Sequence, residues 1–161
     1  MASDPSTTDV TVIGIGSPHG DDQAGWAVID RLRELPARRL RVRKVQNPIE
    51  MIDDLRASSR VYVVDSATGL DLPVERLVVA DPQVRRRITT ERHRLTHDFG
   101  VKDALDLAES LGRPTDQIVL WLIRGERFDA MSTIRNETVS GVDHCVAMIR
   151  AELALLLVQH D

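Results

Sequence analysis

Short aliphatic runs alternate along this chain with segments whose apolar residues recur at helical spacing. Strand-like runs cover residues 10–15, 40–45, 60–64, 74–80 and 117–123. Helical patterns begin at Asp21 or Asp22 and extend to about Leu35, begin again after Asn47-Pro48, and cover residues 101–111 and 137–158. Such alternation is typical of a mostly parallel, twisted sheet with helices on both faces. We therefore predict a single three-layer α/β domain.

The domain is expected to cover residues 10–161, after a flexible N-terminal segment of residues 1–9. Within it, residues 81–99 are polar and irregular and predict a long loop, and long loops in compact domains are often functional. In the helix predicted after Asn47-Pro48, the inward-facing residues should be Ile49, Ile52 and Leu55. In the helix predicted over residues 101–111, Leu111 should face inward.

Composition limits the classes of function. The chain has 161 residues, 42% hydrophobic and 29% charged, as expected for one globular domain. Its net charge of -4 gives no reason to expect a nucleic-acid partner. It has neither an apolar segment of about 20 residues nor a signal-peptide core, so we expect no membrane insertion and a cytoplasmic protein. We also expect a monomer.

In open α/β sheets, ligands bind at the carboxyl ends of the strands. Polar residues follow predicted strands in the turn 14–25, at Asp65 and in the loop around His97. The glycines of the turn resemble the start of a dinucleotide fingerprint, but Asp21 and Asp22 would repel a pyrophosphate at the helix start. No Walker lysine is present. A nucleotide site is therefore the weaker interpretation.

Each of these residues also has an ordinary structural explanation. Asp21 or Asp22 could cap the following helix, Asp65 could bond the amides of its turn, and His97 could be a surface or capping residue. The functional interpretation depends on convergence, because a doubly wound sheet can bring Asp22, Asp65 and His97 to one crevice. Two carboxylates and an imidazole suit a borderline divalent metal such as nickel or zinc.

Four motifs in order resemble the hydrogenase maturation endopeptidases, which remove a C-terminal extension from the large subunit of a nickel–iron hydrogenase after nickel insertion. The resemblance extends over about residues 10–158. The motifs are Gly14-Ile15-Gly16-Ser17 with Asp21-Asp22 and Gly25; Gln46-Asn47-Pro48-Ile49-Glu50; Val63-Val64-Asp65-Ser66-Ala67; and Thr96-His97-Asp98-Phe99-Gly100.

The resemblance implies that Asp22, Asp65 and His97 contact nickel, with Asp21 and Glu50 binding substrate. The nickel would be supplied by the precursor of the hydrogenase large subunit, so no permanent cofactor is expected. The catalytic residues stay unassigned, since no Ser–His–Asp arrangement is evident. The alternative is a non-catalytic module or chaperone that recognises the metallated subunit.

The sequence departs from the family pattern at three places. Ser17 stands where the family has asparagine, Gln23 where it has glycine, and Arg124-Gly125-Glu126 where it often has Glu-Pro. These differences leave the predicted metal ligands intact and bear on substrate specificity.

Overall fold

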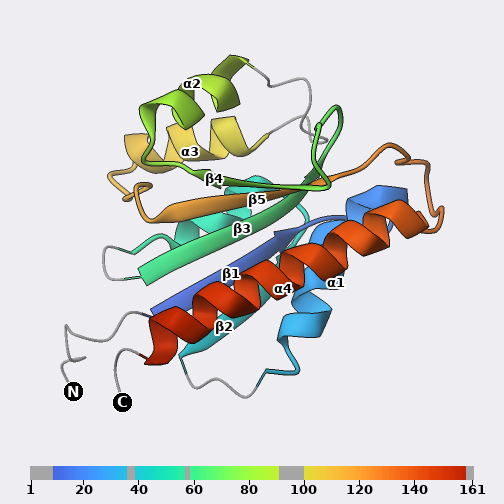
Figure 1. Ribbon diagram of the computed structural model, residues 1–161. Coiled ribbons are helices and arrows are strands. Elements are labelled where there is room, and N and C mark those ends of the chain that lie inside the picture. The colour runs from blue at the N-terminus through green and yellow to red at the C-terminus, as the bar shows by residue number, and fades with distance from the viewer. Residues whose placement is uncertain (1–8, 36–38, 57–58, 91–99, 159–161) are drawn as a thin grey trace.

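Five strands form one sheet in the computed structural model, which describes residues 9–35, 39–56, 59–90 and 100–158 (Figure 1). The strand order is β2-β1-β3-β5-β4, and only β4 is antiparallel to its neighbour. The strands are β1 (Asp9–Ile15), β2 (Leu40–Val45), β3 (Ser59–Ala67), β4 (Val74–Val78) and β5 (Ile118–Arg124). The mostly parallel sheet predicted from the sequence is confirmed.

Helices cover both faces of this sheet and complete the three layers (Figure 1). One face packs against α1 and α4, and the other against η2, α2 and α3. The α-helices are α1 (Ala24–Leu32), α2 (Pro82–Thr90), α3 (Val101–Ser110) and α4 (Asn136–Val158), and the 3-10 helices are η1 (Gly20–Gln23) and η2 (Pro48–Asp54). No helix within the described residues is both long and apolar enough to span a membrane.

The central strands are buried on both faces, which explains their continuous aliphatic sequences. Ile118 to Ile123 of β5 are all buried, as are Val61 to Val64 of β3. Alternate residues of each strand enter the two separate cores: Val61 and Val63 face α3, whereas Tyr62 and Val64 face α1 and α4.

One predicted loop is partly a helix. Residues 82–90 form α2, although the sequence predicts a long irregular loop over residues 81–99; residues 91–99 lie outside the described residues. Asp81 begins the helix by accepting the amide of Gln83 at 2.8 Å, and Pro82 suits the first helical position. Among residues 82–89, whose burial the structure describes, Ile88 alone is buried, so the segment lacks the apolar periodicity that would have predicted a helix.

Two predicted inward-facing residues are exposed. The exposed fractions of Ile49 and Leu111 are 38% and 62%. Leu111 follows the end of α3, where the chain turns away from the core. Ile49 lies in η2, and the three-residue turn of a 3-10 helix instead places Pro48 and Met51 against the core.

The start of α1 lies unusually close to the carboxyl ends of β1 and β3. A Cβ atom on Gly25 would lie 2.2 Å from the carbonyl oxygen of Ile15 and 2.8 Å from that of Val64. A Cβ atom on Gly14 would lie 2.3 Å from the carbonyl oxygen of Gly25. Only glycine therefore permits this approach, which brings the preceding turn over the sheet edge.

Replacing Gly25 by alanine should lower the free energy of unfolding by about 3 kcal/mol or more, because the new methyl group meets backbone atoms that cannot rotate away. The matched control is Gly112→Ala, whose Cβ meets nothing within 4 Å but whose φ of 73° is unfavourable for alanine. That variant should cost about 1 kcal/mol. Urea denaturation measures both, and equal losses would contradict the close-approach explanation.

Candidate functional site

The candidate site lies at the carboxyl edge of the parallel strands (right in Figure 1), where η1 passes the ends of β1 and β3. Asp22 belongs to η1 and is 6% exposed, and Asp65 belongs to β3 and is fully buried. The sequence predicted that Asp65 follows the end of its strand. In the structure Asp65 lies within β3, because this strand continues to Ala67.

A serine connects the two aspartates. The Ser66 hydroxyl donates to Oδ1 of Asp22 at 3.2 Å, and the Ser66 amide donates to Oδ1 of Asp65 at 2.8 Å. The structural role that the sequence suggested for Asp65 was to accept the amides of the turn that follows it. This role is confirmed for the amide of Ser66. Ser66 therefore contacts both carboxylates, Asp22 through its hydroxyl and Asp65 through its amide.

Ser17 fixes Asp22 from the other side. Its hydroxyl donates to Oδ2 of Asp22 at 2.5 Å, and its amide donates to the carbonyl oxygen of Asp22 at 3.2 Å. These two hydrogen bonds tie the turn between β1 and η1 to Asp22. At this departure from the family pattern, serine supplies a direct hydrogen bond to a predicted metal ligand.

Asp21 anchors the loop between β5 and α4. Its carboxylate accepts the amides of Glu126 at 2.8 Å, Arg127 at 3.1 Å and Arg135 at 3.0 Å. It also accepts Nε of Arg135 at 2.7 Å. None of these donors belongs to the helix that follows Asp21, so this aspartate does not cap that helix.

These contacts control the ionisation of Asp21. Burial by itself would raise the pKa of this carboxyl, but the hydrogen bonds from Glu126, Arg135 and Arg127 outweigh it and hold the pKa well below 3.8, the ordinary value. The bond to Asp21 raises the pKa of the Arg135 guanidinium. Asp21 is therefore a buried, ionised anchor with no exposed surface, and the substrate contact predicted for it stays a prediction.

Glu50, the other predicted substrate-binding residue, lies exposed in η2. Its Oε2 accepts the amides of Gln46 at 3.1 Å and Asn47 at 3.0 Å, while the Asn47 side chain accepts the amide of Ile49 at 3.1 Å. This reciprocal pair is a capping box, which starts η2. A substrate contact for Glu50 also stays a prediction.

His97, the third predicted metal ligand, lies outside the described residues. Within the described part of the chain, no group of three or more His, Cys, Asp or Glu side chains could hold a metal ion. The described site therefore contributes the carboxylates of Asp22 and Asp65, and its imidazole ligand stays a prediction from the sequence.

The turn before α1 and the loop before α4 are joined by further contacts. The amide of Gly20 donates to the carbonyl oxygen of Ser132 at 3.0 Å, and the side chain of Gln23 donates to the same oxygen at 3.1 Å. His19 accepts the amide of Met131 at 3.0 Å through Nδ1. Gln23, at another departure from the family pattern, thus holds the two segments together.

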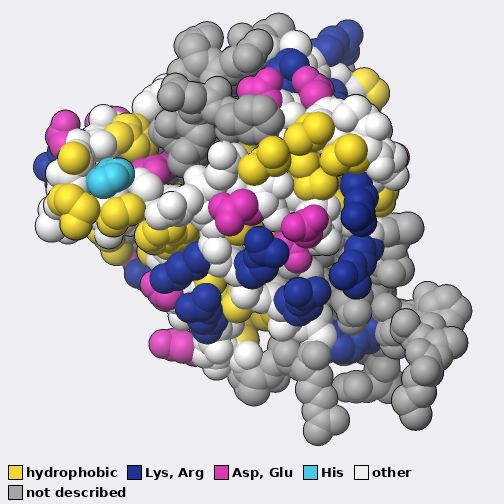
Figure 2. Space-filling model, turned by 180° about the vertical axis from the view of Figure 1, so that it is seen from behind, with side chains coloured by type: hydrophobic (Ala, Val, Ile, Leu, Met, Phe, Trp, Pro, Cys, Tyr) yellow, Lys and Arg dark blue, Asp and Glu magenta, His cyan; other side chains and the backbone are white. Residues whose placement is uncertain are grey.

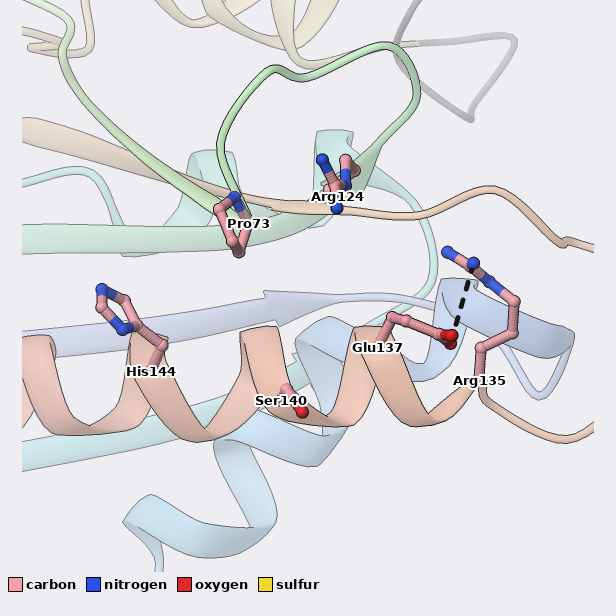
Figure 3. Close-up of a pocket in the computed structure, with 6 residues that line it drawn as sticks. All are labelled: Pro73, Arg124, Arg135, Glu137, Ser140 and His144. Atoms are coloured by element: carbon pink, nitrogen blue, oxygen red, sulfur yellow. Dashed lines mark ion pairs between the residues drawn. The ribbon is translucent and has the colours of Figure 1, made fainter.

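A cavity of about 390 Å³ lies beside this edge, between the ends of β4 and β5 and the first turns of α4 (Figure 3). Its lining residues come from these three elements and the chain just before them: Pro73, Arg124, Arg135, Glu137, Ser140 and His144. Neither the cavity nor the roles of Arg135 and Ser66 were predicted from the sequence. For Ser66, the only available signal was its position next to Asp65 in the third motif.

Sequence comparison identifies no relative: no family profile matches the chain, and no curated protein matches it significantly. Solved structures do match. An Escherichia coli endopeptidase has a TM-score of 0.74 at 15% identity, over 91% of this chain and 92% of that one. The [NiFe] hydrogenase maturation protease HybD from Thermococcus kodakarensis has a TM-score of 0.71 at 19% identity, over 89% and 98%. E. coli HybD has a TM-score of 0.71 at 15% identity, over 91% and 93%.

This chain has the fold of the hydrogenase maturation proteases. The similarity extends over nearly the whole length of both chains, so the maturation-protease fold accounts for all of the layers seen here. Asp22 and Asp65 therefore lie at the carboxyl edge of the parallel strands of this fold.

The Asp21 anchor can be tested by Asp21→Asn, which keeps the shape of the side chain but removes its charge. The free energy of unfolding should fall by about 2 to 4 kcal/mol at pH 7. Because folding lowers the pKa of Asp21 below 3.8, its contribution is complete above that pH and is lost as the pH falls further. The difference between wild type and variant should therefore shrink below pH 3.8.

Urea denaturation at a series of pH values measures this difference. Asp53→Asn is the control, since Asp53 is an exposed acid on η2 and should change stability little. A pH-independent difference for Asp21→Asn would contradict the ionised anchor.

Proposed function

We propose that this protein is a hydrogenase maturation endopeptidase, which removes the C-terminal extension of a nickel–iron hydrogenase large-subunit precursor and uses the substrate-bound nickel as its recognition signal. The observation that carries the proposal is the pair of carboxylates that Ser66 holds together at the sheet edge. The fold supports it, because several proteins that share this fold are hydrogenase maturation proteases.

The chemistry of the pair fits a divalent ion carried by the substrate. Asp22 and Asp65 lie on neighbouring elements and are almost completely buried, so their charges are poorly screened by water. Burying two negative charges close to each other is costly unless a cation balances them. This cost favours binding of a precursor that carries a metal ion. A neutral His97 imidazole would complete a mixed oxygen and nitrogen set suited to nickel.

The protein residues would act mainly by positioning. Ser17 and Ser66 donate hydroxyl hydrogens to the two oxygens of Asp22, which fixes the direction of its remaining lone pairs. Docking of the nickel against these oxygens would place one peptide bond of the precursor at the sheet edge. The nickel itself could act as a Lewis acid on the scissile carbonyl or on water, or could serve only to position the bond.

The surface around this edge suits a peptide. Met131 is 74% exposed on the loop before α4, and Leu72 is 60% exposed on the loop between β3 and β4. Figure 2 shows hydrophobic side chains gathered near a histidine at this end of the molecule (left in that view). Exposed apolar residues on loops at a strand-end crevice provide contacts for an extended substrate segment.

Asp22→Asn and Asp65→Asn should each reduce processing of the nickel-loaded precursor by about 100-fold or more, because each removes a charged ligand while keeping the side-chain shape. The loss of precursor mass measures cleavage. Asp53→Asn should process normally. Full processing by both site variants would contradict the assignment.

A precursor prepared without nickel should keep its extension, because the proposed recognition requires the metal. Mass spectrometry of nickel-free and nickel-loaded precursor after equal incubation measures the difference. Equal cleavage of both would refute recognition through nickel. A stable complex of the loaded precursor without any loss of mass would favour the non-catalytic binding module.

A further inference from the structure

One side of the sheet ends at β2, because among the strands that the structure describes β2 pairs with β1 alone. Two hydrogen bonds show which backbone groups of β2 face β1. The amide of Val10 donates to the carbonyl oxygen of Arg39 at 3.1 Å, and the amide of Gly16 donates to that of Val45 at 3.0 Å. Residues 39 and 45 therefore direct their backbone groups inward, to the body of the sheet.

The residues between these two alternate between the inner and the outer edge of β2. Arg41 and Arg43 lie at even spacing from residues 39 and 45, so their amides and carbonyls also face β1. The amides and carbonyls of Leu40, Val42 and Lys44 face away from the sheet. An outward row of donors and acceptors is a template for pairing with another extended chain.

The side chains beside this outer edge are basic. Arg41 and Arg43 both approach the buried carboxylate of Asp54 in η2, at 3.9 and 3.0 Å, and the Arg41 side chain is 63% exposed. On the other face, Lys44 pairs with Asp30 at 2.7 Å. The charged side chains of β2 and their ion-pair partners thus carry three positive and two negative charges. Figure 2 shows Lys and Arg side chains gathered on the side of the molecule opposite α4.

These charges select the kind of strand that can pair here. Antiparallel pairing of the edges of two copies of this chain would place their arginines beside one another on one face, and like charges across a strand pair are destabilising. A strand with acidic residues on that face would instead place carboxylates beside Arg41 and Arg43. The partner that fits is therefore an extended acidic segment, held by main-chain pairing and selected by its side chains.

The same edge leads to the carboxylate pair. β2 ends at Val45, which is bonded to the amide of Gly16, and the next residue, Ser17, donates to Asp22. A strand added outside β2 would lie two strand spacings, about 10 Å, from β1. An extended chain covers that distance in about three residues. A segment held along β2 therefore directs the residues beyond its end to the carboxyl edge of the sheet.

We propose that the outer edge of β2 binds an extended acidic segment of the precursor as an additional strand, with its carboxylates beside Arg41 and Arg43. The contact is remote from the cleaved bond, so it contributes affinity and the direction of entry rather than chemistry. The proposal rests on the proposed function in taking the ligand to be a segment of the precursor. The pairing itself needs neither metal nor cleavage.

Three end-blocked heptapeptides test the pairing by NMR titration of the ¹⁵N-labelled protein. The first has three glutamates that alternate with valines, the second has lysines in place of the glutamates, and the third is the glutamate peptide with N-methylated backbone amides. The glutamate peptide should bind at least about tenfold more tightly than either of the others, because they lack the matching charge or the main-chain donors.

Amide hydrogen exchange distinguishes a paired strand from attraction between charges alone. When the glutamate peptide binds, the amides of Val42 and Lys44 should exchange about tenfold more slowly, because these outward donors become bonded. The amides of Arg41 and Arg43, already bonded to β1, should change little. Binding without protection of Val42 and Lys44 would overturn the proposal. Protection that appears without peptide and grows with protein concentration would assign the edge to a second copy and would also overturn it.

Arg41→Gln should weaken binding of the glutamate peptide about threefold, and Arg41→Glu about tenfold, because the second change also adds a repulsive charge. The control is Arg113→Gln, which changes an exposed arginine between α3 and β5 and should leave binding unchanged. Undiminished binding in both Arg41 variants, or equal affinity for the glutamate and lysine peptides, would contradict the proposal.

The peptide measurements separate this proposal from the proposed function. Preference for the glutamate peptide without processing of any precursor would support the docking edge and contradict the protease function. Normal processing together with no preference among the peptides would do the reverse. In an active enzyme, Arg41→Gln should raise KM for the precursor about threefold and leave kcat unchanged, because the contact is made equally in the ground state and the transition state.

Discussion

The buried carboxylate of Asp21 holds two segments together next to the candidate site. One is the 3-10 helix η1, which also carries Asp22, and the other is the loop that leads from β5 to α4. Three amides and one guanidinium from that loop converge on Asp21, more than 100 residues away in sequence. The arrangement of both segments therefore depends on one ionised group, which lies next to a predicted metal ligand.

The layers of the fold could be predicted because they depend on local pattern. Continuous aliphatic runs such as those of β3 and β5 are required of strands buried on two faces, and they are visible in the sequence. Helix α2 could not be recognised in the same way, because a helix that buries little more than Ile88 needs no apolar stripe. Its Asp81-Pro82 start was the available signal, and it was missed.

The candidate site could be predicted only in part. The position of Asp22 and Asp65 at strand ends follows from topology, so their proximity was accessible from sequence. The roles of Ser17, Ser66 and Arg135 depend on side-chain directions and on the path of the β5–α4 loop, which no periodicity specifies. The anchoring role of Asp21 was hidden for the same reason, since its partners are distant in the chain.

The antiparallel edge strand has a consequence for how the chain is made. β4 pairs only with β5, which follows it by about 40 residues, and β5 must enter between β3 and β4 to complete the sheet. During synthesis, β1, β2 and β3 can associate while the outer side of β3 still lacks its neighbour. The nascent chain therefore presents an open strand edge until residue 124 has left the ribosome, and this interval is when it is most exposed to intermolecular pairing.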